Sequence, residues 1–196
     1  MHGLPFGNPA YRLNLLSAVT SVVTVLLVQR ITYHLTNSVT VGTLGALILG
    51  LAVRFWYQAT YSELYPLYNT LIAGTWLALL RFAETGRRRF YVASVVLYAM
   101  AFGVNVPAIV LLPMWIWSVL ATDAKRLTQL RSLVGTMGIV LLIALQYLYV
   151  PLRAFSDPPP MFCNFCPHDW RGVIDFWLGK QWWGISFGLP LKYWLQ

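Results

Sequence analysis

Long uncharged stretches divide this chain, and each is continuously apolar rather than alternating between apolar and polar positions. Five stretches contain no Asp, Glu, Lys or Arg: Leu13–Gln29, Ile31–Val53, Leu64–Leu80, Phe90–Thr122 and Ser132–Leu152. A helix needs about 20 predominantly apolar residues to cross a bilayer. Only helices and closed barrels satisfy their backbone hydrogen bonds in hydrocarbon, and continuous apolar runs exclude the alternating pattern of a barrel. The pattern therefore predicts an all-α membrane protein.

The stretch Phe90–Thr122 determines how many spans we expect. Its 33 residues would form a helix of about 50 Å, whereas the hydrocarbon core of a bilayer is about 30 Å thick. Asn105 and Pro107 lie at its middle, and proline removes a helical hydrogen bond. The basic clusters Arg87–Arg89 and Lys125–Arg131 flank it and are both expected in the cytoplasm. An even number of crossings must separate them, so we expect two short helices that meet near Asn105.

Counting spans from this hairpin predicts a transmembrane bundle in residues 1–150 and an external segment in residues 151–196. The six expected spans are about 13–33, 38–57, 64–83, 90–104, 106–121 and 132–150. The external segment is rich in tryptophan, which favours the membrane–water interface. Within it, residues 170–183 are predicted to form an amphipathic helix on the outer surface.

Composition agrees with a membrane protein and excludes a soluble one. The chain is 58% hydrophobic and only 10% charged, whereas soluble domains carry roughly a quarter of charged residues. The net charge of +8 raises the question of nucleic-acid binding. The basic residues cluster in short loops between apolar runs, however, which is the pattern of cytoplasmic loops. We therefore expect no nucleic-acid partner.

A few polar groups at the predicted membrane edges are candidates for chemistry, because ionisable groups are costly there. Arg54 lies one loop away from Glu63 and would form an ion pair, extend to the interface, or build the floor of an external site. Arg153 follows the last span, where a guanidinium binds a lipid phosphate or anchors the helix. Asn105 either caps a helix break or lines a cavity. His34 is expected in a cytoplasmic loop, without a functional role.

The two cysteines do not make a metal site by themselves. Cys163 and Cys166 form a C-x-x-C motif, which is at most half of a zinc site, and His168 is the one nearby extra ligand. A local disulfide and a pair of ordinary thiols both fit an external segment. We expect no metal. No metalloprotease HExxH motif or phosphate-binding glycine loop occurs in the sequence.

Four stretches, taken in order, resemble a known family. They are Phe6–Ala18; Phe55–Ala59 with Ser62–Tyr65 and Asn69; Gly103–Asn105 with Leu111–Pro113; and Tyr147–Arg153 with Asp157–Pro159, Phe176–Trp177 and Gln181–Trp182. Together they are similar to a large family of bacterial multi-span proteins, once called a domain of unknown function. That family includes the animal endoplasmic-reticulum O-mannosyltransferase that acts on plexin-type receptors. The resemblance implies a GT-C class glycosyltransferase with a polyprenyl-phosphate sugar donor and a site on the outer or lumenal face.

The chain also departs from the family's pattern. Members usually begin with a further span and an external loop, whose acidic residue is taken as the catalytic base. The present sequence starts after the place of that loop, so we assign the base to no residue. The family's Asn-His pair stands here as Asn105-Val106, and its Asn-Trp-Gly run is replaced by Met161–Cys166. We expect an internal fragment that is inactive alone, because loss of a general base costs about 10²–10⁴-fold in rate.

The resemblance implies roles for the candidate residues. Arg153 is expected to bind the donor phosphate. Arg54, Glu63 and Asn105 are expected to line the cavity, with Arg54 orienting Glu63. No cofactor is implied, since the lipid-linked sugar is a substrate. The implied partners are the lipid bilayer, the polyprenyl-phosphate sugar and a protein acceptor.

The expected location is the bacterial inner membrane, or the endoplasmic-reticulum membrane in a eukaryote, with residues 151–196 on the non-cytoplasmic side. Two other functions fit the residues. A transporter would use the break at Asn105 as its substrate site. A non-catalytic membrane scaffold would need no site at all.

Overall fold

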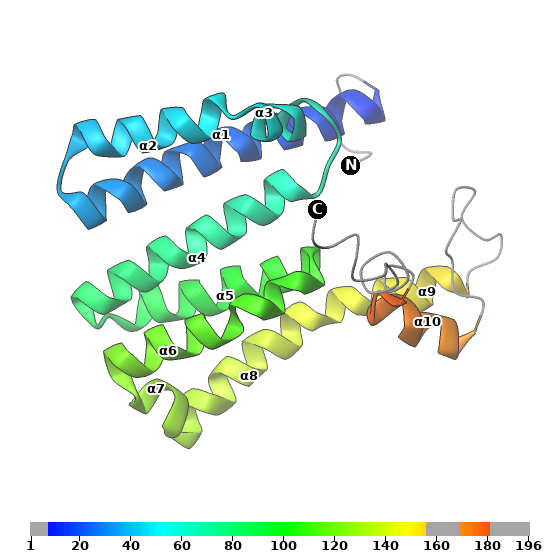
Figure 1. The fold of residues 1–196 in the computed structure, drawn as a ribbon. Helices are drawn as coiled ribbons and strands as arrows, with labels where there is room; N and C mark the ends of the chain where they lie inside the picture. Colours follow the sequence, from blue (N-terminus) through cyan, green and yellow to red (C-terminus); the bar gives the residue numbers. More distant parts are fainter. Residues whose placement is uncertain (1–7, 156–168, 181–196) are drawn as a thin grey trace, which may run out of the picture. The chain divides into compact units, whose positions relative to one another are not determined.

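The computed structural model describes residues 8–155 and 169–180, which are helical almost throughout and contain no strand. They belong to two compact units, one within residues 1–143 and the other within residues 144–196. The first unit contains α1 Pro9–Thr36, α2 Val39–Leu51, α3 Val53–Thr60, α4 Tyr65–Thr85, α5 Arg88–Val104, η1 Val106–Leu111, α6 Leu112–Asp123, α7 Lys125–Thr128 and nearly all of α8 Leu130–Ala144 (Figure 1). The second contains η2 Leu145–Leu148, α9 Tyr149–Ala154 and α10 Trp170–Trp177.

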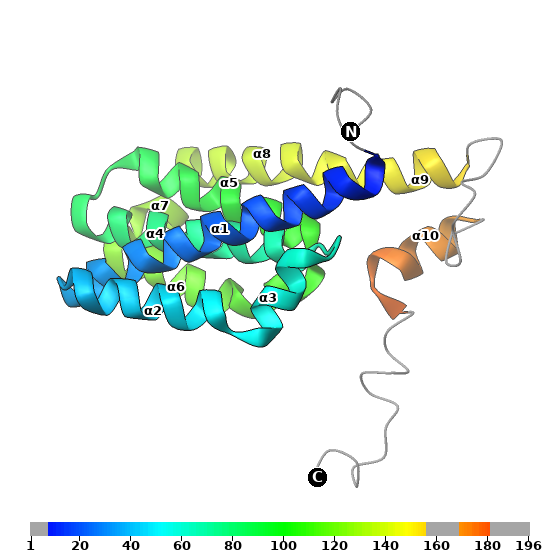
Figure 2. The ribbon, with the colours of Figure 1, turned by 90° about the horizontal axis from the view of Figure 1, so that it is seen from above.

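Local capping explains where α1 begins and where it turns into α2. The Asn8 side chain accepts a hydrogen bond from the Tyr11 N–H (2.8 Å), which satisfies a free donor of the first turn. At the other end Asn37 adopts the left-handed conformation (φ 51°), and its N–H donates to the Tyr33 carbonyl (2.7 Å). Ser38 then caps α2. The tight turn lays α2 alongside α1, as both views show (Figure 2).

The α4–α5 connection is a second tight hairpin. Gly86 ends α4 in the left-handed conformation (φ 61°), where a side chain would be strained, and its N–H donates to the Phe82 carbonyl (2.8 Å). Only Gly86 and Arg87 separate the two helices, so α5 runs back along α4. The end of α5 therefore lies at the end of the unit where α4 begins.

The chain reverses again at Asn105, as the sequence predicted. Asn105 is extended, its N–H donates to the Ala101 carbonyl (2.9 Å), and its own carbonyl accepts from the Ala108 N–H (3.0 Å). The Tyr98 hydroxyl donates to the Ala108 carbonyl (2.7 Å), and the Tyr98 ring stacks on Trp115 of α6 with centroids 6.0 Å apart. The prediction of two helices meeting near Asn105 is confirmed.

A core of apolar and aromatic side chains holds α4, α5 and α6 together. The buried cluster comprises Leu79, Phe82, Tyr91, Val95, Trp115 and Val119. Tyr91 is central to it, since its ring centroid lies 5.6 Å from that of Phe82 and 6.2 Å from that of Trp115. Its hydroxyl lies 2.6 Å from the Thr136 hydroxyl, which connects α8 to the same core.

Hydroxyl groups, rather than apolar contacts alone, join α1 to α4. The Thr70 hydroxyl donates to the Thr20 carbonyl (2.7 Å) and lies 2.8 Å from the Thr24 hydroxyl. Ser17 Oγ lies 3.3 Å from both the N–H and the carbonyl oxygen of Glu63, at the entry to α4. We call these contacts the α1–α4 seam. In hydrocarbon such interhelical hydrogen bonds replace the missing hydrophobic driving force.

Helices occupy all six predicted spans, but fewer than six are long and apolar enough to cross a membrane by themselves. Among the described residues, the helical stretches that meet both conditions are Ala10–Thr36, Val106–Asp123 and Leu130–Leu152. A fourth span results if Val39–Leu51 and Val53–Thr60, which are bent by 64° at Ala52, count as one. The expectation of six independently apolar spans therefore has to be reduced to three or four.

The remaining two helices fall short for different physical reasons. α5 has 17 residues and is about 25 Å long, less than the hydrocarbon thickness of about 30 Å. α4 is long enough, but it carries Tyr68, Asn69 and Thr70 in its first half and both Arg81 and Glu84 near its end. Thr70 bonds to α1 in the seam and Glu84 contacts His34 of α1, so α4 depends on α1 as a partner.

The second unit contains the short helices α9 and α10. The predicted span 132–150 does not stop at Pro151, because α9 continues through it to Ala154. Proline has no N–H to donate to the preceding turn, and the irregularity appears earlier, as the 3₁₀ turn Leu145–Leu148. The predicted helix at residues 170–183 is present as Trp170–Trp177, capped by Asp169, whose carboxylate accepts from the Gly172 N–H (2.6 Å). Its location on an outer surface stays a prediction.

The seam leads to a first testable expectation. Thr70→Val keeps the side-chain shape but removes the hydroxyl that bonds to Thr20 and Thr24. We expect the free energy of unfolding in mixed micelles to fall by about 0.6–1.7 kcal/mol, the range measured for interhelical hydrogen bonds in membranes. Ser118→Ala is the matched control, since the Ser118 hydroxyl donates only to the Met114 carbonyl of its own helix (2.8 Å). Equal losses in both variants would show that the seam does not hold α4.

Candidate functional site

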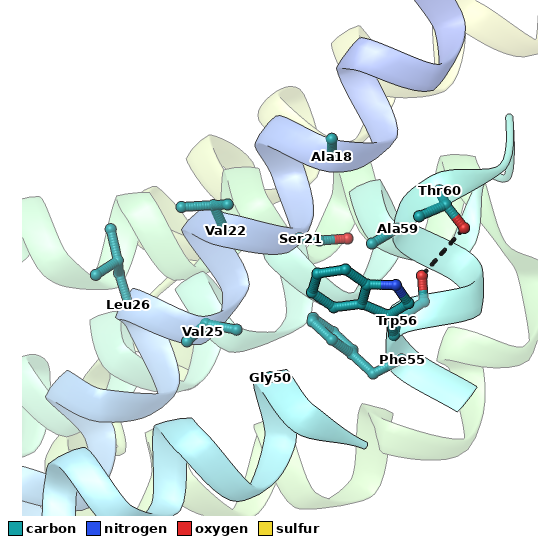
Figure 3. A pocket seen from close by; sticks show the side chains of 10 residues that line it. All are labelled: Ala18, Ser21, Val22, Val25, Leu26, Gly50, Phe55, Trp56, Ala59 and Thr60. Carbon is teal, nitrogen blue, oxygen red and sulfur yellow. Dashed lines mark hydrogen bonds between the residues drawn. The ribbon is translucent and has the colours of Figure 1, made fainter. Parts of the chain in front are cut away.

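A pocket of about 340 Å³ lies at the bend between α2 and α3, against α1 (Figure 3). It is lined by Ala18, Ser21, Val22, Val25, Leu26, Gly50, Phe55, Trp56, Ala59 and Thr60. The bend at Ala52 creates it, because α3 leaves the line of α2 and carries two aromatic rings toward α1. Gly50, which has no side chain, leaves room opposite Val25. The walls are therefore almost entirely apolar and suit a hydrocarbon chain.

Three lining side chains carry a polar atom. They are the hydroxyl groups of Ser21 and Thr60 and the ring nitrogen of Trp56. The Thr60 hydroxyl is satisfied within α3, since it donates to the Tyr57 carbonyl (3.0 Å). The Ser21 hydroxyl is buried and has no hydrogen-bond partner among residues 8–155 and 169–180. Its neighbours Thr20 and Thr24 each donate to a carbonyl of α1, so Ser21 is the exception on this face. It can hydrogen-bond to a ligand in the pocket.

Arg54 and Glu63 both flank this pocket in the chain, but their side chains do not meet. Arg54 directly precedes the lining residue Phe55, and the Glu63 backbone is bonded to Ser17, next to the lining residue Ala18. Both side chains are exposed, and no ion pair involves either of them within the described ranges. No ion pair in the described ranges supports the expected orientation of Glu63 by Arg54, which stays a prediction. Their role at a cavity edge stays a prediction.

Asn105 lies at the same end of the first unit as the entry to α4, but it is not a lining residue of the pocket. Its backbone closes α5 and opens η1, as described above. The capping role considered from the sequence is therefore the one that its backbone contacts display. Whether its half-buried side chain lines a cavity stays a prediction.

Arg153 lies in α9, in the second unit, and its side chain is outside the described residues. Its expected role as the phosphate ligand therefore stays a prediction. Cys163, Cys166 and His168 also lie outside the described residues. In the described part of the chain, no group of three or more His, Cys, Asp or Glu residues is placed to hold a metal ion.

One contact that the sequence did not predict joins the far ends of α1 and α4. His34 is not in a loop, because α1 continues to Thr36. Its Nδ1 lies 2.9 Å from Glu84 Oε1, and Arg81 Nη1 lies 3.6 Å from the other carboxylate oxygen. The sequence did mark Glu84 as unusual, since it is the one acidic residue between Glu63 and Asp123. Its partner His34 could not be predicted, however, because the pairing depends on how α1 packs against α4.

The two basic clusters lie at one end of the first unit. The α1–α2, α4–α5 and α6–α8 connections are at the same end, on the left in Figure 1. Tyr91, near the start of α5, is in contact with Arg126, whose guanidinium lies 6.0 Å from the ring centroid and 3.1 Å from Asp123. Arg87–Arg89 and Lys125–Arg131 are therefore neighbours in space. The pocket lies away from that end, against the middle of α1.

Comparison with known protein families identifies the chain. The family described as the protein O-mannosyl-transferase TMEM260 N-terminal domain matches residues 1–128, well over half of the sequence. The chain belongs to this family. The resemblance inferred from the four sequence stretches is thereby confirmed, and neither a transporter nor a scaffold is favoured. No curated protein and no solved structure matches the chain.

The extent of the O-mannosyl-transferase match separates the candidate residues into two groups. It covers α1 to α7, and with them the pocket, Arg54, Glu63 and Asn105. Arg153 lies beyond residue 128, so its assignment rests on the resemblance of Tyr147–Arg153 alone.

The separation of Arg54 from Glu63 can be tested by a double-mutant cycle. Because the two side chains are not paired, the effects of Arg54→Gln and Glu63→Gln on unfolding free energy should add within about 0.5 kcal/mol. His34→Gln and Glu84→Gln form the positive control, with an expected coupling of about 0.5–1 kcal/mol. A larger coupling free energy for Arg54 and Glu63 than for the control pair would show that their side chains do form an ion pair.

Proposed function

We propose that this chain takes part in protein O-mannosylation, transferring a hexosyl group from a polyprenyl-phosphate donor to a protein hydroxyl. The observation that carries this proposal is the O-mannosyl-transferase family match over residues 1–128. The apolar helices support it, because they place the chain in the membrane, where the polyprenyl chain of a lipid-linked donor lies.

The proposed architecture is a GT-C-like bundle of six spans, with the α2–α3 pair bent and the short α5 included. α4 and α5 cross as partners of their neighbours rather than as independent spans, which the seam and the aromatic core support. The clustered basic residues favour the cytoplasmic side for their end of the bundle. Residues 151–196 are then non-cytoplasmic, in a bacterial inner membrane or an endoplasmic-reticulum membrane.

The proposed chemistry is a direct displacement at the anomeric carbon of the sugar. The acceptor hydroxyl forms the new bond and loses its proton to a general base, while the lipid phosphate leaves with the bonding electron pair. A cation near the phosphate stabilises the developing charge. We assign this role to Arg153 and leave the base unassigned; the proposal includes no metal or cofactor.

Arg153 provides the test of this assignment. In a chain that transfers sugar, whether residues 1–196 or a longer gene product, Arg153→Ala should reduce donor use by roughly 10- to 150-fold, because a charge-assisted phosphate contact contributes about 1.5–3 kcal/mol. Arg153→Lys should restore part of the activity, since an ammonium lacks the planar fork of a guanidinium. Donor turnover is measured with a polyprenyl-phosphate sugar.

Arg171→Ala is the matched control, because Arg171 is an exposed arginine of α10 in the same unit. It should change donor use by much less. If Arg153→Ala lowers only the amount of protein in the membrane and leaves turnover unchanged, Arg153 is an interfacial anchor.

The proposed topology makes a separate prediction. Single cysteines placed at Arg88, Thr128 and Arg171, in a chain with Cys163 and Cys166 replaced by serine, are labelled with a membrane-impermeant maleimide. Positions 88 and 128 should react only from the cytoplasmic side, and position 171 only from the other side. Labelling of 88 and 128 from opposite sides would rule out the membrane hairpin at Asn105.

A further inference from the structure

A second, polar hollow lies on the α1–α2 hairpin, apart from the pocket at the bend. Its volume is about 240 Å³, and it is lined by Gln29, Arg30 and Tyr33 of α1 and by Val39, the first residue of α2. It is close to the end of α1 at Thr36, whereas the apolar pocket is lined by the middle of α1.

The three polar side chains of this hollow can all donate a hydrogen bond, and none has a partner in the described part of the chain. A carboxamide, a guanidinium and a phenol each offer an N–H or O–H. In residues 8–155 and 169–180, the side chains of Gln29, Arg30 and Tyr33 make no hydrogen bond or ion pair. A concave surface that presents a donor-only guanidinium beside two further groups able to donate is complementary to an anion.

Within the ranges 8–155 and 169–180, Arg30 also makes no ion pair. Residues 1–62 contain no Asp or Glu, so α1, α2 and α3 provide no carboxylate. The acid nearest to this end on α4, Glu84, is already in contact with His34 and Arg81. An arginine near the end of a membrane-spanning helix lies within reach of the headgroup layer, where a lipid phosphate can serve as its counter-ion.

The α1 surface next to the hollow continues as an apolar path. Leu26 precedes Arg30 by four residues and Val22 by eight, so the three positions share one face of α1. Leu26 is 56% exposed and Val22 is 60% exposed, and both also line the apolar pocket. From Arg30 to Val22 the helix rises about 12 Å, which is within the length of a lipid acyl chain.

We propose that this surface binds one anionic phospholipid. Its phosphate accepts hydrogen bonds from Arg30, Gln29 and Tyr33, and one acyl chain runs along Leu26 and Val22 into the apolar pocket at Gly50. The guanidinium can bind the phosphate bidentately. The site does not depend on which leaflet faces it, and it is independent of the proposed sugar transfer.

Lipid titration of the purified chain in detergent, followed by native mass spectrometry, tests the proposal. Phosphatidylglycerol should bind. Diacylglycerol with the same chains lacks the phosphate, and glycerol phosphate lacks the chains, so both should bind far more weakly. Equal binding of diacylglycerol, or competition by glycerol phosphate at the same concentration as the lipid, would overturn the proposal.

Variants locate the headgroup. Arg30→Gln should weaken phosphatidylglycerol binding by roughly 10-fold or more, and Arg30→Lys by less. Arg131→Gln is the matched control, because Arg131 is an exposed arginine at the start of α8, and the α6–α8 and α1–α2 connections lie at the same end of the unit (Figure 1). This variant should bind the lipid as the unchanged chain does. Equal losses in Arg30→Gln and Arg131→Gln would indicate diffuse attraction to a basic surface and would overturn the site. Tyr33→Phe, which preserves shape, should still weaken binding if Arg30→Gln does not fold.

A further pair of variants locates the acyl chain. A methyl group added at Gly50 meets Val25 at an ordinary contact distance of 3.6 Å, so Gly50→Leu should fold and fill the pocket. It should weaken binding of phosphatidylglycerol several-fold. Gly135→Leu places the same change in a helix position with open space around it and should have no effect. Unchanged binding in Gly50→Leu would overturn the placement of the chain.

Discussion

The contact between α1 and α4 is the constraint on which the rest of the first unit depends. Apolar helices gain little by associating in hydrocarbon, so close packing and hydrogen bonds must select their partners. Thr70 with Thr20 and Thr24 fixes the middle of the pair, and Glu84 with His34 fixes the end. These contacts lie along most of α1, so they determine its register against α4. Because α4 leads through a two-residue turn into α5, the same register places the aromatic core and both basic clusters.

Much of this arrangement could be predicted from the sequence, because charge and proline mark it locally. Arg87–Arg89 and Lys125–Arg131 at the ends of an overlong apolar stretch implied a reversal, and it occurs at Asn105. The bend at Ala52 had no such mark, since neither proline nor a charge stands at that position. It arises where the extended backbone of Ala52 interrupts two apolar helices. The pocket, which depends on that bend, was therefore missed.

The candidate residues show why sequence proximity is a poor guide to polar contacts. Arg54 and Glu63 are nine positions apart, yet they belong to a helix and to the loop after it, and their exposed side chains form no ion pair in the described residues. Glu63 instead contributes its backbone to Ser17, forty-six residues away. His34 and Glu84, fifty residues apart, do pair. Pairing follows the register of packed helices, which only the tertiary structure supplies.

The positions of the cations on α1 match the thickness of a membrane. Arg12 and Arg30 bound a charge-free stretch, and eighteen residues of helix separate them by about 27 Å, close to the hydrocarbon thickness of about 30 Å. Each arginine then falls at a headgroup layer when the helix crosses with little tilt. The α1 helix extends beyond both, from Pro9 to Thr36, so its ends belong to the interfacial layers. Under this geometry Arg30 meets lipid phosphates whatever the orientation of the protein. In the proposed site, Gln29 and Tyr33 line the same hollow as Arg30, so two further donors add to that general attraction.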